Sequence, residues 1–198
     1  IILLLLRLPI LVVHILVGLF TILFFPKEPK NFKNSHYRIM MLWMNILSSI
    51  LGIKVDIRGI PDQSANLFVS NHVTYLDIII INKLLPVNFI AKEEISSWPV
   101  IGRLASKTGT LFIKRGDNVE SSKMIYEMEE RFKLQNKIVF FPEGKIGNGK
   151  RVRKFHYKLF KSIENKELYI QPIAIRYPTG YPINNNYSAV SYTHLRAH

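Results

Sequence analysis

Short apolar runs alternate with amphipathic segments from residue 54 onward. Runs of about four to eight apolar or β-branched residues are typical of strands, and an apolar residue at every third or fourth position is typical of a helix. The runs predict strands over residues 54–58, 66–70, 87–91, 109–113, 137–141 and 168–175. The amphipathic segments predict helices over 77–85, 99–107 and 118–135. Because strands and helices alternate, we expect residues 54–189 to form one α/β domain with helices on the faces of a sheet.

The N-terminal quarter of the chain has a different pattern. Residues 1–25 are almost wholly apolar, although Arg7 and His14 interrupt them, and a membrane-spanning helix needs about 20 such residues. A signal peptide is the alternative, but no small-residue cleavage site precedes Pro26. A second apolar stretch at 39–53 is short and interrupted, which is typical of an interfacial helix or of a helix packed on the first.

Positive charge follows the first apolar stretch. The basic residues there are Lys27, Lys30, Lys33 and Arg38. Positively charged flanks favour the cytoplasmic side of a membrane. We therefore expect residues 1–53 to form a membrane-anchoring helical segment, either as a single crossing or as a hairpin in one leaflet, with the α/β domain on the cytoplasmic face.

The composition narrows the range of partners. The chain of 198 residues is long enough for one domain with its own core, and its formal net charge is +13 at pH 7. Such a charge implies acidic partners: phosphorylated ligands, anionic lipid or nucleic acid. There is no cysteine, so disulfides, thiolate catalysis and cysteine-bound metal are excluded within this sequence. No cluster of other metal-ligating residues stands out, and we expect no metal.

A histidine and an aspartate flank a predicted junction between a strand and a helix. His72 follows the strand at 66–70, and Asp77 begins the helix at 77–85. On one continuous helix a separation of five residues corresponds to about 140° of rotation, so the two side chains would diverge. If the strand ends at His72 and the helix begins near Thr74, the turn between them brings Asp77 back to the imidazole. A histidine oriented by a carboxylate is a common general base; the alternative is a turn histidine and an aspartate that favours the helix dipole.

Polar side chains also follow two later strands. Arg115 comes just after the strand at 109–113, where a guanidinium suits bidentate phosphate binding. Glu143 and Gly144 follow the strand at 137–141, and a glycine there lets backbone N–H groups approach a phosphate or a developing oxyanion. The simpler alternatives are a solvated arginine and an ordinary turn. Since ligands of α/β sheets collect at strand ends, these residues are candidates for one site.

A basic run and a proline lie further along the chain. The basic run consists of Lys145, Lys150, Arg151, Arg153 and Lys154. Such runs are usually solvated faces, but this one adjoins the candidate site and is suited to phosphates or anionic headgroups. Pro172 lies within the strand at 168–175, which predicts a bulge or an edge position there.

Taken in order, these motifs resemble those of the glycerolipid acyltransferases of the 1-acylglycerol-3-phosphate acyltransferase type. The resemblance covers about residues 54–177, and the apolar N-terminal segment also fits. Its residues are His72 with Asp77, Phe112 to Arg115, the Phe-Pro-Glu-Gly of 141–144 and the Ile-Gln-Pro of 170–172. Ala91-Lys92, Trp98 to Gly102 and Gly109-Thr110 are similar to the same family.

The resemblance implies a mixed sheet flanked by helices, and acyl transfer without an acyl-enzyme. His72 would take the proton from a lipid hydroxyl, which attacks the thioester of acyl-CoA or acyl-carrier protein, and Asp77 would orient the imidazole. Arg115 would bind the acceptor's phosphate, in a subsite shaped by Glu143 and Gly144. Pro172 would be structural or line the acyl side. No cofactor beyond the acyl donor is implied, and the partners are membrane phospholipid and lysolipid, in a bacterial inner membrane.

The third motif departs from the family pattern. It commonly continues from Glu-Gly with Thr and often Arg, whereas here Lys145 and Ile146 follow, so Lys145 is the candidate for the missing charge. Residues 151–156 also loosely resemble a bacterial subgroup in which lyso-ornithine lipid acyltransferases occur. Lysophosphatidate is therefore the expected acceptor, with another lysolipid such as lyso-ornithine lipid as the alternative.

Other functional classes fit less of the sequence. A non-catalytic, basic membrane-surface module explains the charge and the apolar N-terminus but leaves the ordered motifs as coincidence. A nucleic-acid binder fits poorly, because no known binding motif interleaves the basic residues with aromatics. A serine-hydrolase route is disfavoured by the lack of a Gly-x-Ser-x-Gly motif.

The two ends of the sequence do not read as natural termini. The first residue is Ile rather than Met, and residues 190–198 follow a polar loop without an apolar period. The last residues also resemble a translated sequencing-adapter tail. We expect residues 190–198 to be non-native and the natural chain to extend beyond this sequence.

Overall fold

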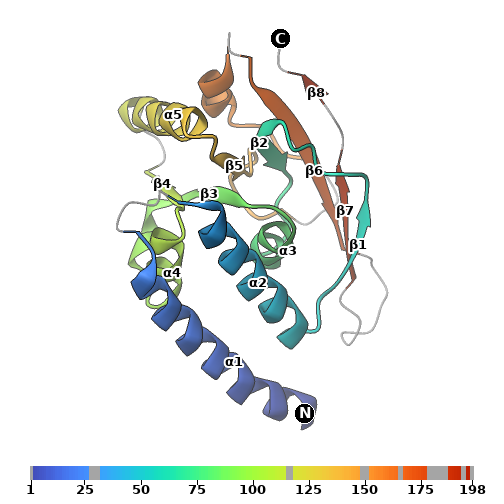
Figure 1. The fold of residues 1–198 in the computed structure, drawn as a ribbon. Coiled ribbons are helices and arrows are strands. Elements are labelled where there is room, and N and C mark those ends of the chain that lie inside the picture. The colour runs from blue at the N-terminus through green and yellow to red at the C-terminus, as the bar shows by residue number, and fades with distance from the viewer. Residues whose placement is uncertain are drawn as a thin grey trace.

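A mixed eight-stranded sheet forms the centre of the molecule, with the strands in the order β1-β7-β6-β2-β5-β3-β4 and β8 beside β6 (Figure 1). The computed structural model describes residues 2–26, 32–114, 118–147, 152–164, 167–177, 187–192 and 195–196. The strands are β1 Lys54–Arg58, β2 Ala65–Ser70, β3 Val87–Lys92, β4 Leu111–Ile113, β5 Lys137–Phe140, β6 Tyr169–Arg176, β7 Tyr187–Tyr192 and β8 Leu195–Arg196. Neighbouring strands from β6 through β2, β5 and β3 to β4 are parallel, whereas β6 pairs antiparallel with β7 and β8. The predicted α/β class and mixed sheet are confirmed.

Helices cover both faces of this sheet. The α-helices are α1 Ile2–Thr21, α2 Asn34–Ile50, α3 Leu76–Leu84, α4 Ile101–Lys107 and α5 Asn118–Lys133. The 3-10 helices are η1 Ile22–Phe24, η3 Glu93–Ser97 and η4 Tyr157–Ile163. The sequence pattern did not predict η3, η4, β7 or β8. Helix α4 begins two residues later than the predicted start at 99, because Val100 has φ 64° and so lies outside the helical region.

The central strands are buried on both faces. In β2, the Phe68 side chain packs with Ile80 and Ile81 of α3, while its neighbours Leu67 and Val69 pack on the side of α5. Successive side chains of a strand point to opposite faces, so one apolar run supplies two cores. The sheet is thereby fixed between α3 on one face and α5 with η4 on the other, and the carboxyl end of β2 is held at a defined position.

Pro172 does not occupy the position that was predicted for it. Strand β6 lies between β7 and β2, so it is not an edge strand. The irregularity in its pairing with β2 lies on β2, between Ala65 and Leu67. Pro172 itself pairs with Val69 on one side, and on the other side the partner of β6 changes there from β8 to β7. Among the described residues, β8 pairs with β6 before Pro172 and β7 pairs with it after Pro172, so the missing N–H falls where one outer partner gives way to the other.

The N-terminal helices α1 and α2 lie side by side outside the sheet (Figure 1). The His14 and Trp43 rings stack with centroids 4.5 Å apart, and the Trp43 indole N–H donates to the His14 carbonyl at 3.2 Å. His14 Nε2 lies 3.1 Å from the Trp43 carbonyl oxygen. These reciprocal contacts fasten α1 to α2.

Residues 6–24 are long and apolar enough to cross a membrane. Their large side chains are mostly exposed, among them Leu16 and Phe20, so this is not the buried core helix of a soluble domain. An exposed apolar helix of this length needs an apolar medium around it. The segment therefore associates with a membrane.

A buried hydroxyl ties α2 to the sheet. Tyr37 Oη lies 2.9 Å from Asn88 Oδ1, at the start of β3, and 3.0 Å from Asn136 Oδ1, just before β5. Burial raises the pKa of Tyr37 to about 12, so the hydroxyl keeps its proton at any physiological pH. Helix α2 is therefore joined to the α/β domain by a hydrogen bond from an uncharged hydroxyl.

Replacement of Tyr37 by phenylalanine is expected to lower the free energy of unfolding by about 1–3 kcal/mol. The change keeps the ring but leaves Asn88 Oδ1 without this donor in a buried place. Denaturant unfolding measures the effect. The matched control is Tyr126→Phe, because Tyr126 is an exposed tyrosine on α5 and its loss of a hydroxyl should change stability little. Equal stability of the two variants would contradict this role for Tyr37.

Candidate active site

The His72 and Asp77 side chains meet at the carboxyl end of β2. His72 Nδ1 lies 2.8 Å from Asp77 Oδ2, and the Asp77 side chain is 0% exposed. Strand β2 ends at Ser70 and α3 begins at Leu76, so the intervening turn folds the aspartate back onto the imidazole. The predicted contact is present, although the strand ends two residues before His72.

Asp77 is held by donors from its own turn. Its Oδ2 accepts from the backbone N–H of Val73 at 2.6 Å and of Thr74 at 3.0 Å, besides the contact with His72. Backbone donors of this kind stabilise the charged carboxylate. The carboxylate in turn favours the imidazole tautomer that carries its proton on Nδ1, which leaves Nε2 as the basic nitrogen.

The imidazole is also clamped from a second strand. Phe141, which directly follows β5, stacks on the His72 ring with centroids 4.0 Å apart and an interplanar angle of 12°. The backbone N–H of Gly147 donates to the His72 carbonyl at 2.7 Å. The His72 side chain is 12% exposed. Its orientation is therefore fixed while an edge remains open to a ligand.

Tyr177 completes the surroundings of Asp77, and sequence reasoning missed it. Its hydroxyl donates to Asp77 Oδ1 at 2.6 Å from just beyond β6. Asn71 secures this approach, because its side-chain amide donates to the Ile175 carbonyl at 2.9 Å and accepts from the Ile175 N–H at 2.8 Å. The only available signal was a tyrosine immediately after a strand predicted to end at the same edge of the sheet.

Replacement of Tyr177 by phenylalanine is expected to lower kcat roughly tenfold with little change in KM. A hydrogen bond to a buried charge is worth about 1.5–3 kcal/mol, and part of this is lost from the orientation of Asp77 and hence of His72. Steady-state kinetics measure the effect. A change in KM alone would place Tyr177 in acceptor binding instead.

The loop after β5 carries the next group of candidates. Glu143 is buried, and its Oε2 accepts from the backbone N–H of Arg153 at 2.9 Å. Gly144 has φ 67°, a conformation that strains other residues, and its N–H donates to the Phe141 carbonyl at 2.9 Å. Glu143 thus holds the basic segment around Arg153 against the loop, whereas the adjacent Lys145 is exposed.

A cavity of about 620 Å³ adjoins this loop. It is lined by Phe141, which stacks on His72, and by residues 142–145 and 153–159, with Ile90, Ala91, Ile113, Ser121 and Phe140 as the rest of its wall. Lys145, Arg153 and Lys154 bring positive charge to it. Glu143 is the one acidic residue among these lining residues, and its carboxylate is turned to the Arg153 backbone. The cavity therefore suits an anionic group next to the imidazole.

Arg115 and Pro172 are the remaining residues of the predicted site. Arg115 lies outside the described residues; the strand before it, β4, ends at the same edge of the sheet as β2, since both belong to the parallel set. Pro172 pairs with Val69 in β2, upstream of His72. Within the described ranges no group of three or more His, Asp or Glu residues is placed to hold a metal ion.

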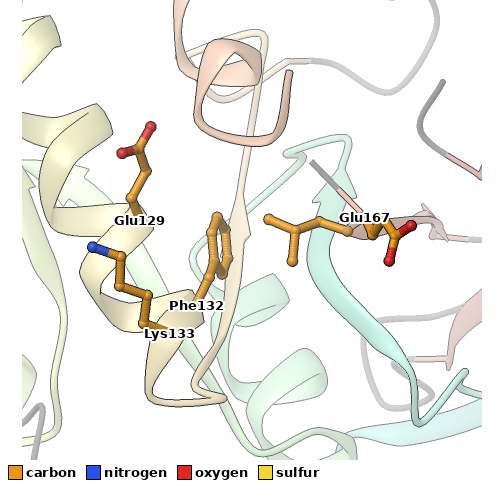
Figure 2. Close-up of a pocket in the computed structure, with 5 residues that line it drawn as sticks. Glu129, Phe132, Lys133 and Glu167 are labelled. Atoms are coloured by element: carbon orange, nitrogen blue, oxygen red, sulfur yellow. The ribbon is translucent and has the colours of Figure 1, made fainter. Parts of the chain in front are cut away.

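A smaller pocket of about 230 Å³ lies away from this site. Figure 2 shows Phe132 pointing from α5 toward the segment of Glu167, with Glu129 and Lys133 on the same helix. These residues precede β5 and β6, at the amino ends of strands whose carboxyl ends lie on the side of His72. The pocket is apolar at its base and does not adjoin the imidazole.

The sequence is similar to known lipid acyltransferases. The lyso-ornithine lipid O-acyltransferase of Pseudomonas aeruginosa is 35% identical over 140 residues, which are 71% of this chain and 54% of that protein. The 1-acyl-sn-glycerol-3-phosphate acyltransferase of Neisseria gonorrhoeae is 30% identical over 147 residues, which are 73% of this chain and 57% of that protein. The chain thus spans about half the length of the curated relatives it matches.

The fold also has a counterpart among solved structures. The crystal structure of the 1-acyl-sn-glycerophosphate (LPA) acyltransferase PlsC from Thermotoga maritima superposes with a TM-score of 0.72, covering 98% of this chain and 84% of that one, at 18% sequence identity. That likeness establishes the common fold. The model of the acyltransferase family matches residues 53–176, which include β1 to β6 and the His72–Asp77 turn. The chain belongs to the acyltransferase family.

Proposed function

We propose that this chain transfers an acyl group from acyl-CoA or acyl-carrier protein to the free hydroxyl of lysophosphatidate, giving phosphatidate. The observation that carries the proposal is the 2.8 Å contact between His72 Nδ1 and the buried Asp77 carboxylate, which leaves Nε2 as the basic nitrogen of a side chain that is 12% exposed. Family membership supports acyl transfer as the reaction type. No cofactor is required, because the thioester itself is the activated donor.

In the proposed reaction, His72 is the general base. Nε2 takes the proton of the acceptor hydroxyl as its oxygen attacks the thioester carbonyl. Asp77 stabilises the imidazolium that forms. The new C–O bond is an ester, the C–S bond breaks, and the departing thiolate takes the proton back from Nε2. The histidine is thus restored without an acyl-enzyme.

The charge of the cavity favours a phosphorylated acceptor. Lys145, Arg153 and Lys154 are exposed along it, and Arg115 follows a strand that ends at the same edge. A phosphate monoester is attracted by such a cluster, whereas an amine is repelled. We therefore prefer lysophosphatidate, with Glu143 and Gly144 shaping the loop of the phosphate subsite and Pro172 in a structural role.

Lyso-ornithine lipid is the second candidate acceptor. Two of the curated relatives, at 35% and 36% identity, are named lyso-ornithine lipid O-acyltransferases. Lys145 and Ile146 also replace the Thr and Arg that commonly follow Glu-Gly in this type of enzyme. For either acceptor, we propose that the apolar N-terminal helix holds the protein at the bacterial inner membrane with the α/β domain on the cytoplasmic face.

Acceptor profiling tests the proposal. The purified full-length protein is given labelled acyl-CoA or acyl-carrier protein with lysophosphatidate, lyso-ornithine lipid or other lysolipids, and products are separated by chromatography. We expect phosphatidate as the main product. A product from lyso-ornithine lipid alone would select the second acceptor. No product from any pair would favour a non-catalytic membrane-binding module and overturn the proposal.

Replacement of Arg115 or Lys145 by alanine is expected to raise KM for lysophosphatidate about tenfold with a smaller change in kcat. Each loss removes a charge-assisted contact with the acceptor's phosphate. Arg58→Ala is the control, because Arg58 is an exposed arginine on β1 whose contact with Asp56 is a surface pair. An unchanged KM in both variants would assign the phosphate to another subsite.

A further inference from the structure

Three large side chains near His72 remain exposed to solvent. Tyr75 is 57% exposed, Trp98 40% and Ile101 53%. The Tyr75 and Trp98 rings lie with their centroids 6.2 Å apart. We call this surface the aromatic shelf; it consists of the aromatic residues Tyr75 and Trp98 and the aliphatic Ile101. Large aromatic residues exposed together are unusual on a surface that contacts only water.

The shelf adjoins the imidazole directly. The His72 and Tyr75 ring centroids are 6.4 Å apart, with the rings nearly perpendicular at 88°. The same imidazole stacks on Phe141, which lines the cavity with the basic residues Lys145, Arg153 and Lys154. His72 therefore contacts both the cavity, through Phe141, and the shelf, through Tyr75.

A strained turn presents Trp98. Val100 has φ 64° and ψ −65°, and the N–H of Ile101 donates to the Pro99 carbonyl at 2.6 Å. This is the γ-turn with positive φ, which is rare, and a β-branched residue in it is a marked outlier. Strain of this kind persists where the surrounding structure enforces it, and it is concentrated at functional sites.

Close packing enforces the turn. A Cβ on Gly102 would lie 2.2 Å from the Ser96 carbonyl oxygen, so only glycine fits there. The Gly102 N–H donates to the Trp98 carbonyl at 2.9 Å, and the Trp98 N–H donates to the Ile95 carbonyl at 3.1 Å. The backbone of Trp98 is thereby fixed on both sides, and its exposed indole lies beside Tyr75.

The shelf also borders the membrane helix. Ile101 is the first residue of α4, and α4 contacts α1 (Figure 1). The large apolar side chains of α1 are mostly exposed. The contacts thus run from α1 to α4, and from Trp98 through Tyr75 to His72, which offers a membrane-held lysolipid an apolar route to the imidazole. The acyl donor is carried by a water-soluble group, so it has no need of this route.

We infer that the aromatic shelf binds the acyl chain of the lysolipid acceptor and so positions its hydroxyl at His72 Nε2. This inference rests on the proposed function. The acceptor's anionic head lies in the cavity beside Lys145 and Arg153, its hydroxyl lies at the imidazole, and its chain crosses Tyr75 and Trp98. The shelf therefore makes affinity depend on the length of the acceptor's chain, whatever the length of the donor's.

Chain-length kinetics test the inference. For the native full-length protein we expect KM to fall as the acceptor's acyl chain lengthens from 6 to 18 carbons, on the order of tenfold overall. In Trp98→Ala this dependence of KM on chain length is largely lost, and Trp98→Phe restores most of it. Tyr126→Ala, an exposed aromatic on α5, is the control and keeps the native dependence. An unaltered chain-length dependence in Trp98→Ala overturns the inference.

Binding without turnover separates this inference from the proposed function. The chain has 2 tryptophans, so the difference in fluorescence between His72→Ala and its Trp98→Phe derivative isolates Trp98. Lysophosphatidate with a spin-labelled chain should quench Trp98, even if no acceptor is ever acylated. Quenching by a spin-labelled acyl-CoA instead would overturn the inference. The inference would also be overturned if Trp98→Ala lost sedimentation with phosphatidylglycerol vesicles to the same extent as it lost lysolipid binding. The shelf would then be only an interfacial anchor.

Discussion

Replacement of His72 by alanine is expected to lower kcat/KM for acyl transfer by about 10³-fold or more. General-base catalysis contributes about 10²- to 10⁴-fold in comparable sites. Because Nδ1 is held by Asp77, Nε2 is the nitrogen left to act as the base. Phe141 keeps its place after β5 and the helices α1 and α2 are not touched by the change, so membrane association should be intact. Product formation and vesicle sedimentation measure the two properties separately.

His36→Ala is the matched control for loss of a histidine. His36 lies in the first turn of α2, where its Nδ1 accepts from the Lys33 N–H at 3.0 Å and its ring packs against Phe25 and Phe32, away from His72. We expect nearly native activity from it. Retained activity in His72→Ala would remove this residue from the mechanism and would require a different base.

Replacement of Asp77 by asparagine is expected to lower kcat about 10²- to 10⁴-fold. The amide keeps the shape of the side chain, but one acceptor oxygen becomes an NH₂ group. Either this group faces the Val73 and Thr74 N–H groups, or it faces the Tyr177 hydroxyl. In the first orientation the tautomer with its proton on Nδ1 is no longer favoured, and in both orientations the neutral amide stabilises the imidazolium less than the carboxylate does.

The same replacement should also lower the free energy of unfolding by about 1–3 kcal/mol, because a buried donor is left without its acceptor. A double variant distinguishes catalysis from stability. If the two residues act as one unit, His72→Ala with Asp77→Asn is no slower than His72→Ala alone, assayed well below the unfolding temperature. If Asp77→Asn keeps the native kcat, Asp77 has no part in catalysis. Its role would then be only to stabilise helix α3 through the helix dipole.

The strands and helices of the domain could be predicted largely from local pattern. Strand β2 follows from the apolar run Leu67–Val69, because burial on both faces of a parallel sheet requires nearly continuous apolar sequence. Helix α3 follows from the apolar run Ile78–Ile81. The predicted start of α4 at 99 was wrong because the γ-turn at Val100 depends on contact with Ser96 and not on propensity. The edge position predicted for Pro172 was wrong because β7 pairs with β6 from Ile173 onward and makes it an inner strand, and no local pattern of residues shows that pairing.

The candidate site was predictable only in part. The approach of Asp77 to His72 could be foreseen because the intervening turn is short and both residues lie at one strand end. The prediction that Arg115 binds phosphate is untested, since this residue lies outside the described part of the chain. The basic run of residues in the cavity wall was visible in the sequence. That Phe141 would bring this cavity next to the imidazole was not.

By itself the sequence determined the α/β class, the apolar anchor, the His–Asp turn and the excess of positive charge. Each of these depends on residues close together in the chain or on composition alone. The tertiary structure decided that Tyr177 would donate to Asp77 from 100 residues away, that Phe141 would stack on the imidazole, and that Trp98 would lie beside Tyr75. Those contacts depend on the pairing of β2 with β5 and β6 and on a strained turn. Strand order and close packing arise from the whole core at once, so no local pattern of residues encodes them.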